Sequence, residues 1–239
     1  MKASLAVASR NPRAEGKQRT SRRPQRLARP RKARGKAPLS KEDGGGNEAS
    51  APRILTIGHS TRPIAEFVRL LRAHAVTRVV DVRTVPRSRH NSQFNRDNLP
   101  TSLRAAGITY LHLPALGGLR RTTADSPNKG WRNLSFRGYA DHMQSPEFHA
   151  AIDQLIELAA KDRLALMCAE AVPWRCHRSL IADALLVRGL ATADISSATR
   201  LSPHRLTPFA KIRRGNITYP AHVPSPSRRA PAPPARRRA

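Results

Sequence analysis

Short apolar runs alternate with segments of helical spacing along the middle of this 239-residue chain. Four apolar runs have the length of buried strands and cover residues 54–57, 78–82, 108–113 and 164–168. Apolar side chains recur at helical spacing in four further segments, at residues 63–71, 99–106, 146–159 and 176–187. Such alternation predicts an α/β fold, namely a single three-layer domain with a small, mostly parallel sheet flanked by helices.

Two segments of the middle region lack either pattern. Residues 86–98 are too polar for a core element and predict a long loop. Residues 120–137 show no period of either kind, so we expect them to be irregular.

The two ends of the chain differ in composition from the middle. All ten aromatic residues fall between Phe67 and Tyr219, and the ends are rich in basic residues and proline. Such segments bury too little apolar surface to offset the entropy lost on ordering. We therefore expect disordered basic tails at residues 1–50 and 221–239, and one compact domain at residues 51–220.

The charge of the chain is strongly basic but unevenly spread. Lys and Arg number 44 against 16 Asp and Glu, a formal net charge of +28. Residues 1–50 carry +10 of this charge and residues 213–239 carry +7. Basic segments attract phosphates, so the charge favours an anionic partner such as DNA or RNA, while a solvated tail without a partner is the alternative.

Several classes of protein are excluded. No stretch of about 18 apolar residues is present, so a membrane span is not expected. Two cysteines are too few for a disulfide-dense secreted scaffold. No apolar segment follows Met1, and we expect a cytoplasmic protein, with a mitochondrial transit peptide as the alternative reading of the Arg-rich start.

Polar and reactive residues follow the predicted strands. They are His59 and Ser60, Asp81 and Arg83, Gly117 and Gly118, and Cys168 and Glu170. Ligands of open parallel sheets bind outside the carboxyl ends of the strands. The sequence therefore predicts a pocket at this edge of the sheet.

Both cysteines lie in the segment 168–178, between a buried strand and a helix. Cys176 would stand at the start of that helix, flanked by Arg175, His177 and Arg178. Backbone N–H groups and nearby cations favour a thiolate there, and the same groups favour a bound anion.

Three interpretations of this cysteine segment remain open. A nucleophilic cysteine is typical of phosphatases and rhodaneses, but six residues separate Cys168 from Arg175 instead of five, and Glu170 would repel phosphate. A metal ion held by Cys168, Cys176 and His177 together with an acid or His59 is the second interpretation. In the third, both cysteines are structural.

The loop at residues 87–96 combines cations and amides with one aromatic, Phe94. That mixture suits phosphate contacts and base stacking, although it also suits a solvated loop. Three later aromatics, Trp131, Phe136 and Tyr139, would cover the pocket or pack in the core.

Taken together, the motifs resemble the family of the domain of unknown function 488. The resemblance rests on residues 56–61, 81–83, 86–88 with 94–95, 116–118, 136–139, 167–170 and 176–178. It covers about residues 51–220 and implies a compact bacterial α/β domain. It implies no activity, because the family is uncharacterised.

Two hypotheses about function follow. The first is an enzyme that acts on an anionic substrate, with a nucleotide or nucleic acid favoured by charge. Its catalytic candidates are Cys168, Glu170, Cys176, His177 and Asp81, and its substrate-binding candidates are His59, Ser60, Arg83, Asn95, Gly118, Arg175 and Arg178. The second is a non-catalytic nucleic-acid-binding module that uses the basic tails and the 87–96 loop.

Overall fold

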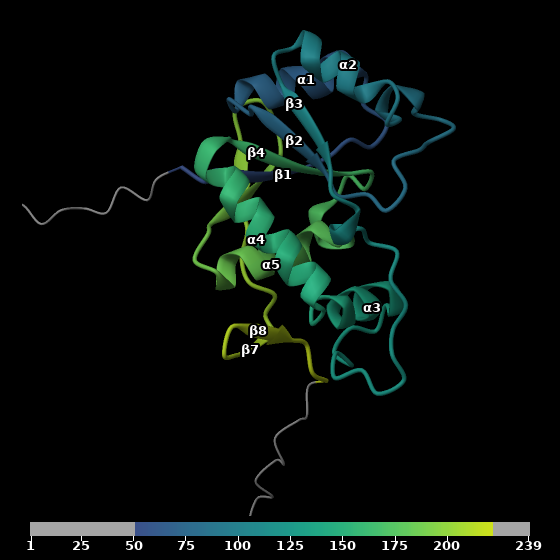
Figure 1. The fold of residues 1–239 in the computed structure, drawn as a ribbon, viewed down its shortest axis with the longest axis vertical. Helices are drawn as coiled ribbons and strands as arrows, with labels where there is room; N and C mark the ends of the chain where they lie inside the picture. Colours follow the sequence, from purple (N-terminus) through teal and green to yellow (C-terminus); the bar gives the residue numbers. More distant parts are fainter. Residues whose placement is uncertain (1–50, 222–239) are drawn as a thin grey trace, which may run out of the picture. The chain divides into compact units, whose positions relative to one another are not determined.

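A computed structural model of the chain describes residues 51–221 (Figure 1). Apart from Ala221, the predicted tails lie outside the described residues, so the predictions about them stay predictions.

A six-stranded sheet runs through the described region, in the order β3-β2-β4-β1-β5-β6. The strands are β1 (Ile54–Gly58), β2 (Arg78–Asp81), β3 (Thr109–His112), β4 (Leu164–Cys168), β5 (Thr192–Ile195) and β6 (Leu201–Pro203). All neighbouring pairs are parallel except β5 and β6, which are antiparallel. Every residue of β1 and β4 is buried, which explains why these strands are continuous apolar runs in the sequence.

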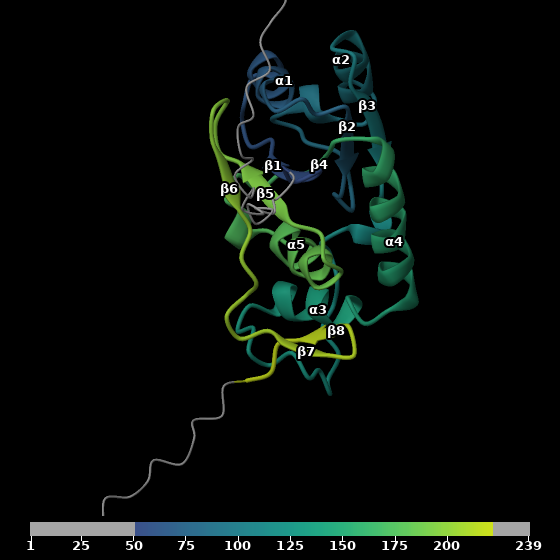
Figure 2. The same cartoon turned by 90° about the vertical axis from the view of Figure 1, so that its left-hand side faces the viewer.

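Helices cover both faces of the sheet and complete three layers (Figures 1 and 2). The helices are α1 (Ile64–Ala73), α2 (Leu99–Ala105), α3 (Leu134–His142), α4 (Pro146–Lys161) and α5 (Arg178–Val187). One core cluster joins α1 and α2 to one face of the sheet, and a second joins α3, α4 and α5 to the other. The predicted α/β class and mostly parallel sheet are confirmed.

Short 3-10 turns connect some of these elements, at η1 (Ser92–Phe94), η2 (Pro114–Leu116) and η3 (Pro173–Arg175). The first interrupts the polar segment expected to be a loop, and the third lies inside the cysteine segment.

The expectation that residues 120–137 are irregular is wrong at its end, because α3 begins at Leu134. Asn133 caps this helix, and its side chain accepts hydrogen bonds from the backbone N–H groups of Ser135 and Phe136. Gly138 lies in the middle of the helix, where a Cβ would stand 2.5 Å from the carbonyl oxygen of Arg120. This close packing requires the glycine, and the glycine weakens the helical signal in the sequence.

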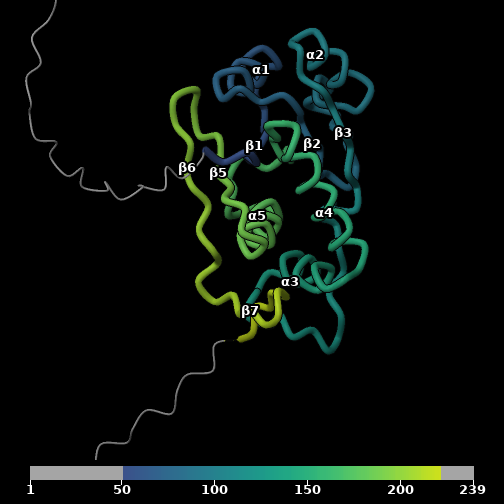
Figure 3. Tube along the Cα trace, turned by 60° about the vertical axis from the view of Figure 1, so that its left-hand side comes forward, coloured from purple at the N-terminus to yellow at the C-terminus, as the bar shows by residue number. Residues whose placement is uncertain are grey.

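The C-terminal part of the described chain runs beside α5 and ends in a small hairpin (Figure 3). The hairpin pairs β7 (Lys211–Arg213) with β8 (Asn216–Thr218). Buried Asp183 on α5 holds this segment, since its carboxylate accepts hydrogen bonds from the Tyr219 hydroxyl at 2.8 Å and the Thr207 N–H at 3.1 Å, and contacts His204 Nε2 at 2.7 Å.

The order of the strands places a switch point at the carboxyl end of β4. Its neighbours β1 and β2 lead into α1 and α2 on one face, whereas β4 leads into α5 on the other. Loops that diverge in this way leave a crevice between them, where ligands of open α/β sheets bind.

None of the helices in residues 51–221 combines the length and apolar character needed to cross a membrane.

Candidate functional site

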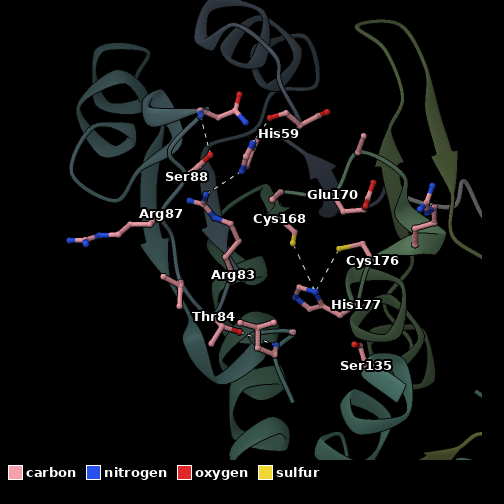
Figure 4. A pocket seen from close by; sticks show the side chains of 18 of the residues that line it. His59, Arg83, Thr84, Arg87, Ser88, Ser135, Cys168, Glu170, Cys176 and His177 are labelled. Atoms are coloured by element: carbon pink, nitrogen blue, oxygen red, sulfur yellow. Dashed lines mark hydrogen bonds between the residues drawn. The ribbon is translucent and has the colours of Figure 1, made fainter. Parts of the chain in front are cut away.

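A cavity of about 680 Å³ opens at this switch point (Figure 4). Nine of the residues predicted for a site line it: His59, Ser60, Arg83, Gly118, Cys168, Glu170, Arg175, Cys176 and His177. They come from the ends of β1, β2 and β4, from the segment after η2, and from the approach to α5. The rule that ligands bind at strand ends therefore located this cavity correctly.

Cys168, Cys176 and His177 form a compact cluster at the base of the cavity. Their ligating atoms all lie within 4.8 Å of one another. The Nδ1 atom of His177 is 4.0 Å from Cys168 Sγ and 3.7 Å from Cys176 Sγ. Cys168 is the last residue of β4 and Cys176 follows η3, so strand and loop bring the two thiols together.

The orientation of the His177 ring is fixed from its other side. Nε2 lies 3.0 Å from the carbonyl oxygen of Val82, an acceptor only, so Nε2 carries the proton and donates it. The neutral ring then has its lone pair on Nδ1, the nitrogen that faces both sulfur atoms. A backbone carbonyl that fixes the tautomer in this way is the usual partner of a metal-ligating histidine.

Gly118 and Tyr139 hold this ring in place. A Cβ at Gly118 would stand 2.5 Å from His177 Nδ1, so only glycine leaves the nitrogen free. The ring of Tyr139 packs against His177 with centroids 5.0 Å apart, and its hydroxyl donates to the Leu116 carbonyl oxygen at 3.0 Å. Burial raises the pKa of Tyr139 well above its usual value, so this hydroxyl remains a donor.

Arg178 is fully buried behind the thiols and does not line the cavity. Its Nε donates to Cys176 Sγ at 3.4 Å, and its Nη2 donates to the backbone oxygen of Glu170 at 2.7 Å.

The hydrogen bond from the Cys168 thiol lowers the pKa of Cys176, with His177 and Arg178 adding to the effect, while burial opposes it. The same hydrogen bond, with burial, raises the pKa of Cys168. The pair therefore favours one thiolate, on Cys176.

Arg83 lines the cavity and is held by a buried network. Its guanidinium forms two hydrogen bonds with Asp81, at 2.9 Å from Nε and 2.6 Å from Nη2. Nη2 also donates to the carbonyl oxygen of Phe94 at 2.7 Å, and Nη1 lies 3.2 Å from His59 Nε2. Asp81 is fully buried and also accepts from Tyr110 at 2.9 Å. The structure thus places Asp81 behind Arg83 and not on the cavity surface.

His59 is buried and stacks on Phe94, with ring centroids 4.2 Å apart. Its Nδ1 donates to the Ser60 carbonyl oxygen at 2.8 Å, and its Nε2 faces Arg83. Burial lowers the pKa of His59 to about 4. The ring is neutral at physiological pH and both nitrogens are engaged, so His59 supports Arg83.

The loop at residues 87–96 lies along one side of the cavity, to which Arg87, Ser88 and Asn91 contribute. Asn95 lies off the cavity, and its side-chain oxygen accepts from the Ser88 N–H at 2.6 Å. Phe94 is fully buried, so the suggestion that this loop stacks bases is wrong, because its aromatic ring packs against His59 and Phe67.

Sequence reasoning missed part of the lining. The cavity is also lined by four residues that the sequence analysis did not name: Thr84, Val85, Leu119 and Ser135. Phe136, for which the sequence left the pocket and the core as alternatives, lines the cavity as well. Val85 and Leu119 are 58% and 76% exposed, and exposed apolar residues carry no periodic signal in a sequence. Of the other two late aromatics, Tyr139 is fully buried in the core and Trp131 packs against Phe136, Phe209 and Tyr219.

Comparison with protein families gives one match. The family model described as Domain of unknown function DUF488 matches residues 63–185. The chain belongs to the DUF488 family. The match runs from the start of α1 into α5 and includes the whole cysteine segment, whereas β1 and His59 precede it. Searches of curated proteins and of solved structures gave no match.

Proposed function

We propose that this DUF488 protein is an enzyme that holds a divalent transition metal ion, such as Zn²⁺, at Cys168, Cys176 and His177 and hydrolyses an anionic substrate in the adjoining cavity. The observation that carries the proposal is the His177 ring. Its Nε2 is bound to the Val82 carbonyl oxygen, and its free Nδ1 faces two cysteine sulfurs.

The spacing of the three ligand atoms supports the proposal. Zinc bonds of about 2.3 Å to sulfur and about 2.0–2.1 Å to nitrogen give sulfur–nitrogen separations of about 3.5 Å in a tetrahedral site. The nitrogen–sulfur separations here are 3.7 and 4.0 Å, within a few tenths of an ångström of this value, and all three ligand atoms lie within 4.8 Å of one another. Thiolate and imidazole are ligands that zinc prefers.

The ligand number points to a reactive site. Within residues 51–221, these three side chains are the only group of three or more His, Cys, Asp or Glu placed to share an ion. Structural zinc sites have four protein ligands, whereas catalytic sites have three and leave one position for water or substrate. All three residues line the cavity, which a substrate would enter.

The surrounding side chains supply the rest of the chemistry. A bound ion would act as a Lewis acid and lower the pKa of water. Glu170 lines the cavity with one carboxylate oxygen accepting from the Val172 N–H at 3.2 Å, so the carboxylate is held there to accept a proton from water. The water oxygen would bond to the electrophilic atom of the substrate, the bond from that atom to the leaving group would break, and Glu170 would return the proton to the leaving group. Arg83, Arg87 and Arg175 would bind the anion.

A second candidate function is thiol-based catalysis without a metal. It is favoured by one contact, the donation from Arg178 Nε to Cys176 Sγ at 3.4 Å, which stabilises a thiolate. The same contact would also stabilise a thiolate that ligates a metal, so it does not favour this candidate over the first.

Two further proposals concern partners and location. A nucleotide or nucleic acid remains our proposed source of the anion, on the basis of charge. Both cysteines are free, and a site that needs reduced thiols suits the cytoplasm, where we propose the protein acts.

Elemental analysis of the untagged chain, purified under reducing conditions and desalted, tests the function. We expect about one equivalent of a transition metal in the unaltered chain. Cys168→Ser, Cys176→Ser and His177→Gln should each lower metal affinity at least tenfold, because each removes one of three ligands.

His149→Gln is the matched control, since His149 lies on α4 away from the cavity and should leave the metal content unchanged. The proposal fails if the unaltered chain neither contains nor takes up one equivalent of metal, or if the ligand variants keep it. Rapid alkylation of Cys176 in a metal-free chain would then favour thiol catalysis.

A further inference from the structure

The cavity has two walls of different chemistry, on opposite sides of the cysteine–histidine cluster. Figure 4 shows His59, Arg83 and Ser88 on one side of His177, and Thr84 and Ser135 on the other. The first side is cationic and rich in hydrogen-bond donors, whereas the second carries exposed apolar side chains.

One donor on the cationic wall is buried and has no partner. The guanidinium of Arg83 carries five N–H bonds, and four of them point to Asp81, Phe94 or His59. The remaining N–H, on Nη1, has no acceptor within the described residues. Arg83 is only 6% exposed and lines the cavity, so this N–H is fixed and available to a ligand.

Further donors and charges line the same cavity. Arg87 and Arg175 are exposed cations that line the cavity, against the single carboxylate of Glu170. Ser60 also lines it and has a left-handed backbone conformation with φ of 49°, rare for a residue other than glycine. Its hydroxyl makes no hydrogen bond to residues 51–221. Strained residues of this kind are concentrated at ligand sites.

The apolar wall consists of Val85, Leu119 and Phe136. The N–H of Leu119 donates to Thr84 Oγ1 at 3.1 Å, which places Leu119 beside Thr84 and Val85. Phe136 is adjacent to Ser135 at the start of α3. Leu119 is 76% exposed although it lines a concave surface. Contact with an apolar ligand would remove its apolar surface from water and so favour binding.

We infer that the cavity binds small phosphate monoesters that carry an apolar group, with the phosphate at Arg83 and Arg87 and the apolar group against Leu119 and Phe136. The inference rests on the proposed function in that it places the substrate beside the metal cluster. Asp81 offsets the charge of Arg83, so Arg87 and Arg175 supply the positive charge that attracts a phosphate monoester, and Arg83 supplies its remaining N–H as a donor. A cavity of about 680 Å³ has the size of sites that bind such small molecules.

Phosphonates test this inference because their C–P bond resists hydrolysis. Phenylphosphonate and methylphosphonate share the anion and differ in the organic group, and phenol supplies the ring alone. Titration calorimetry on the full chain should show that phenylphosphonate binds at least tenfold more tightly than methylphosphonate or phenol.

Two pairs of variants assign the walls. Arg87→Gln should weaken the binding of phenylphosphonate at least fivefold. Arg89 is an exposed arginine of the same loop outside the lining, so Arg89→Gln should leave this binding unchanged. Leu119→Asn should weaken the binding of phenylphosphonate but not that of methylphosphonate. Leu134→Asn, a 60% exposed leucine outside the lining, should change neither.

The inference is overturned if phenylphosphonate binds no more tightly than methylphosphonate, or if the control variants weaken binding as much as their partners. The same titrations on chelator-treated protein separate this inference from the proposed function. Binding that persists in a chain unable to hold metal would uphold the inference while the proposed metal chemistry fails.

Discussion

The reactive atoms of this site are held in place by residues that would not react themselves. His177 Nδ1 faces the two sulfurs because the Val82 carbonyl oxygen binds the opposite nitrogen and because Gly118 leaves the space beside Nδ1 empty. Arg83 is aligned in the same way by Asp81 and His59. At the scale of single residues, the site is therefore tested best through its supporting positions.

Gly118→Ala should lower metal affinity at least tenfold, because the added Cβ would stand 2.5 Å from His177 Nδ1 and displace the ring. Metal titration of the refolded or native variant measures this loss. Gly189→Ala is the contrasting control. Gly189 has a φ of +80° with open space around it, so its variant should lose about 1 kcal/mol of stability but no metal affinity. Equal metal affinities in the two variants would contradict this role of Gly118.

His59 should make stability depend on pH. Its pKa is about 4 in the folded protein against 6.5 in an unfolded chain, so between these values the unfolded state binds more protons. The resulting stabilisation, about 3 kcal/mol, is complete above pH 6.5 and is lost as the pH falls to about 4. His59→Gln should therefore flatten the pH dependence of the unfolding free energy over this window, measured by urea denaturation. An unchanged slope would show that His59 is not held neutral.

At the scale of elements, α5 serves two regions at once. Its N-terminal end follows Cys176 and His177, and its interior carries Asp183, which holds the C-terminal segment. The loop that leads to α5 also crosses close to β1, since any side chain at Gly58 would overlap the Glu170 backbone. Cys176 and His177, two of the three proposed metal ligands, are thus set at the start of the helix, while the hairpin is anchored further along it.

Tyr219→Phe should separate these two roles. It removes the hydrogen bond to Asp183 and leaves the carboxylate with His204 and Thr207, which should cost about 1–3 kcal/mol of unfolding free energy. Metal affinity should stay within twofold of the unaltered chain, because the proposed ligands all precede the helix and none of them contacts Asp183. A large loss of metal affinity would mean that the hairpin supports the site directly.

At the scale of the whole molecule, the sequence predicts best those strands that are buried on both faces of the sheet. The runs at β1 and β4 are continuous because each strand is covered on both faces, and the rule for strand ends then located the cavity. The elements α3 and β5 to β8 were not predicted. Their strands have three or four residues, and α3 contains a glycine, so local patterns are weak.

The apolar wall of the cavity could not be predicted for a different reason. Leu119 reaches the site because the segment after η2 packs against the strand ends, and no spacing in the sequence encodes that contact. For Phe136 the sequence left the pocket and the core as alternatives, and the structure places it in the cavity lining. The opposite charges of Asp81 and Arg83, two residues apart, are visible in the sequence. The burial of their ion pair, which changes Asp81 from a candidate acid into a support for Arg83, needed the structure.

X-ray absorption at the metal edge of the zinc-loaded chain tests the central claim most directly, because it counts the neighbours of the ion by element and distance. The account predicts two sulfur neighbours at about 2.3 Å and one nitrogen at about 2.0–2.1 Å, with a light atom completing a four-coordinate site. It also predicts the loss of one sulfur in Cys176→Ser. A coordination sphere of nitrogen and oxygen alone, or one unaffected by this substitution, would contradict it.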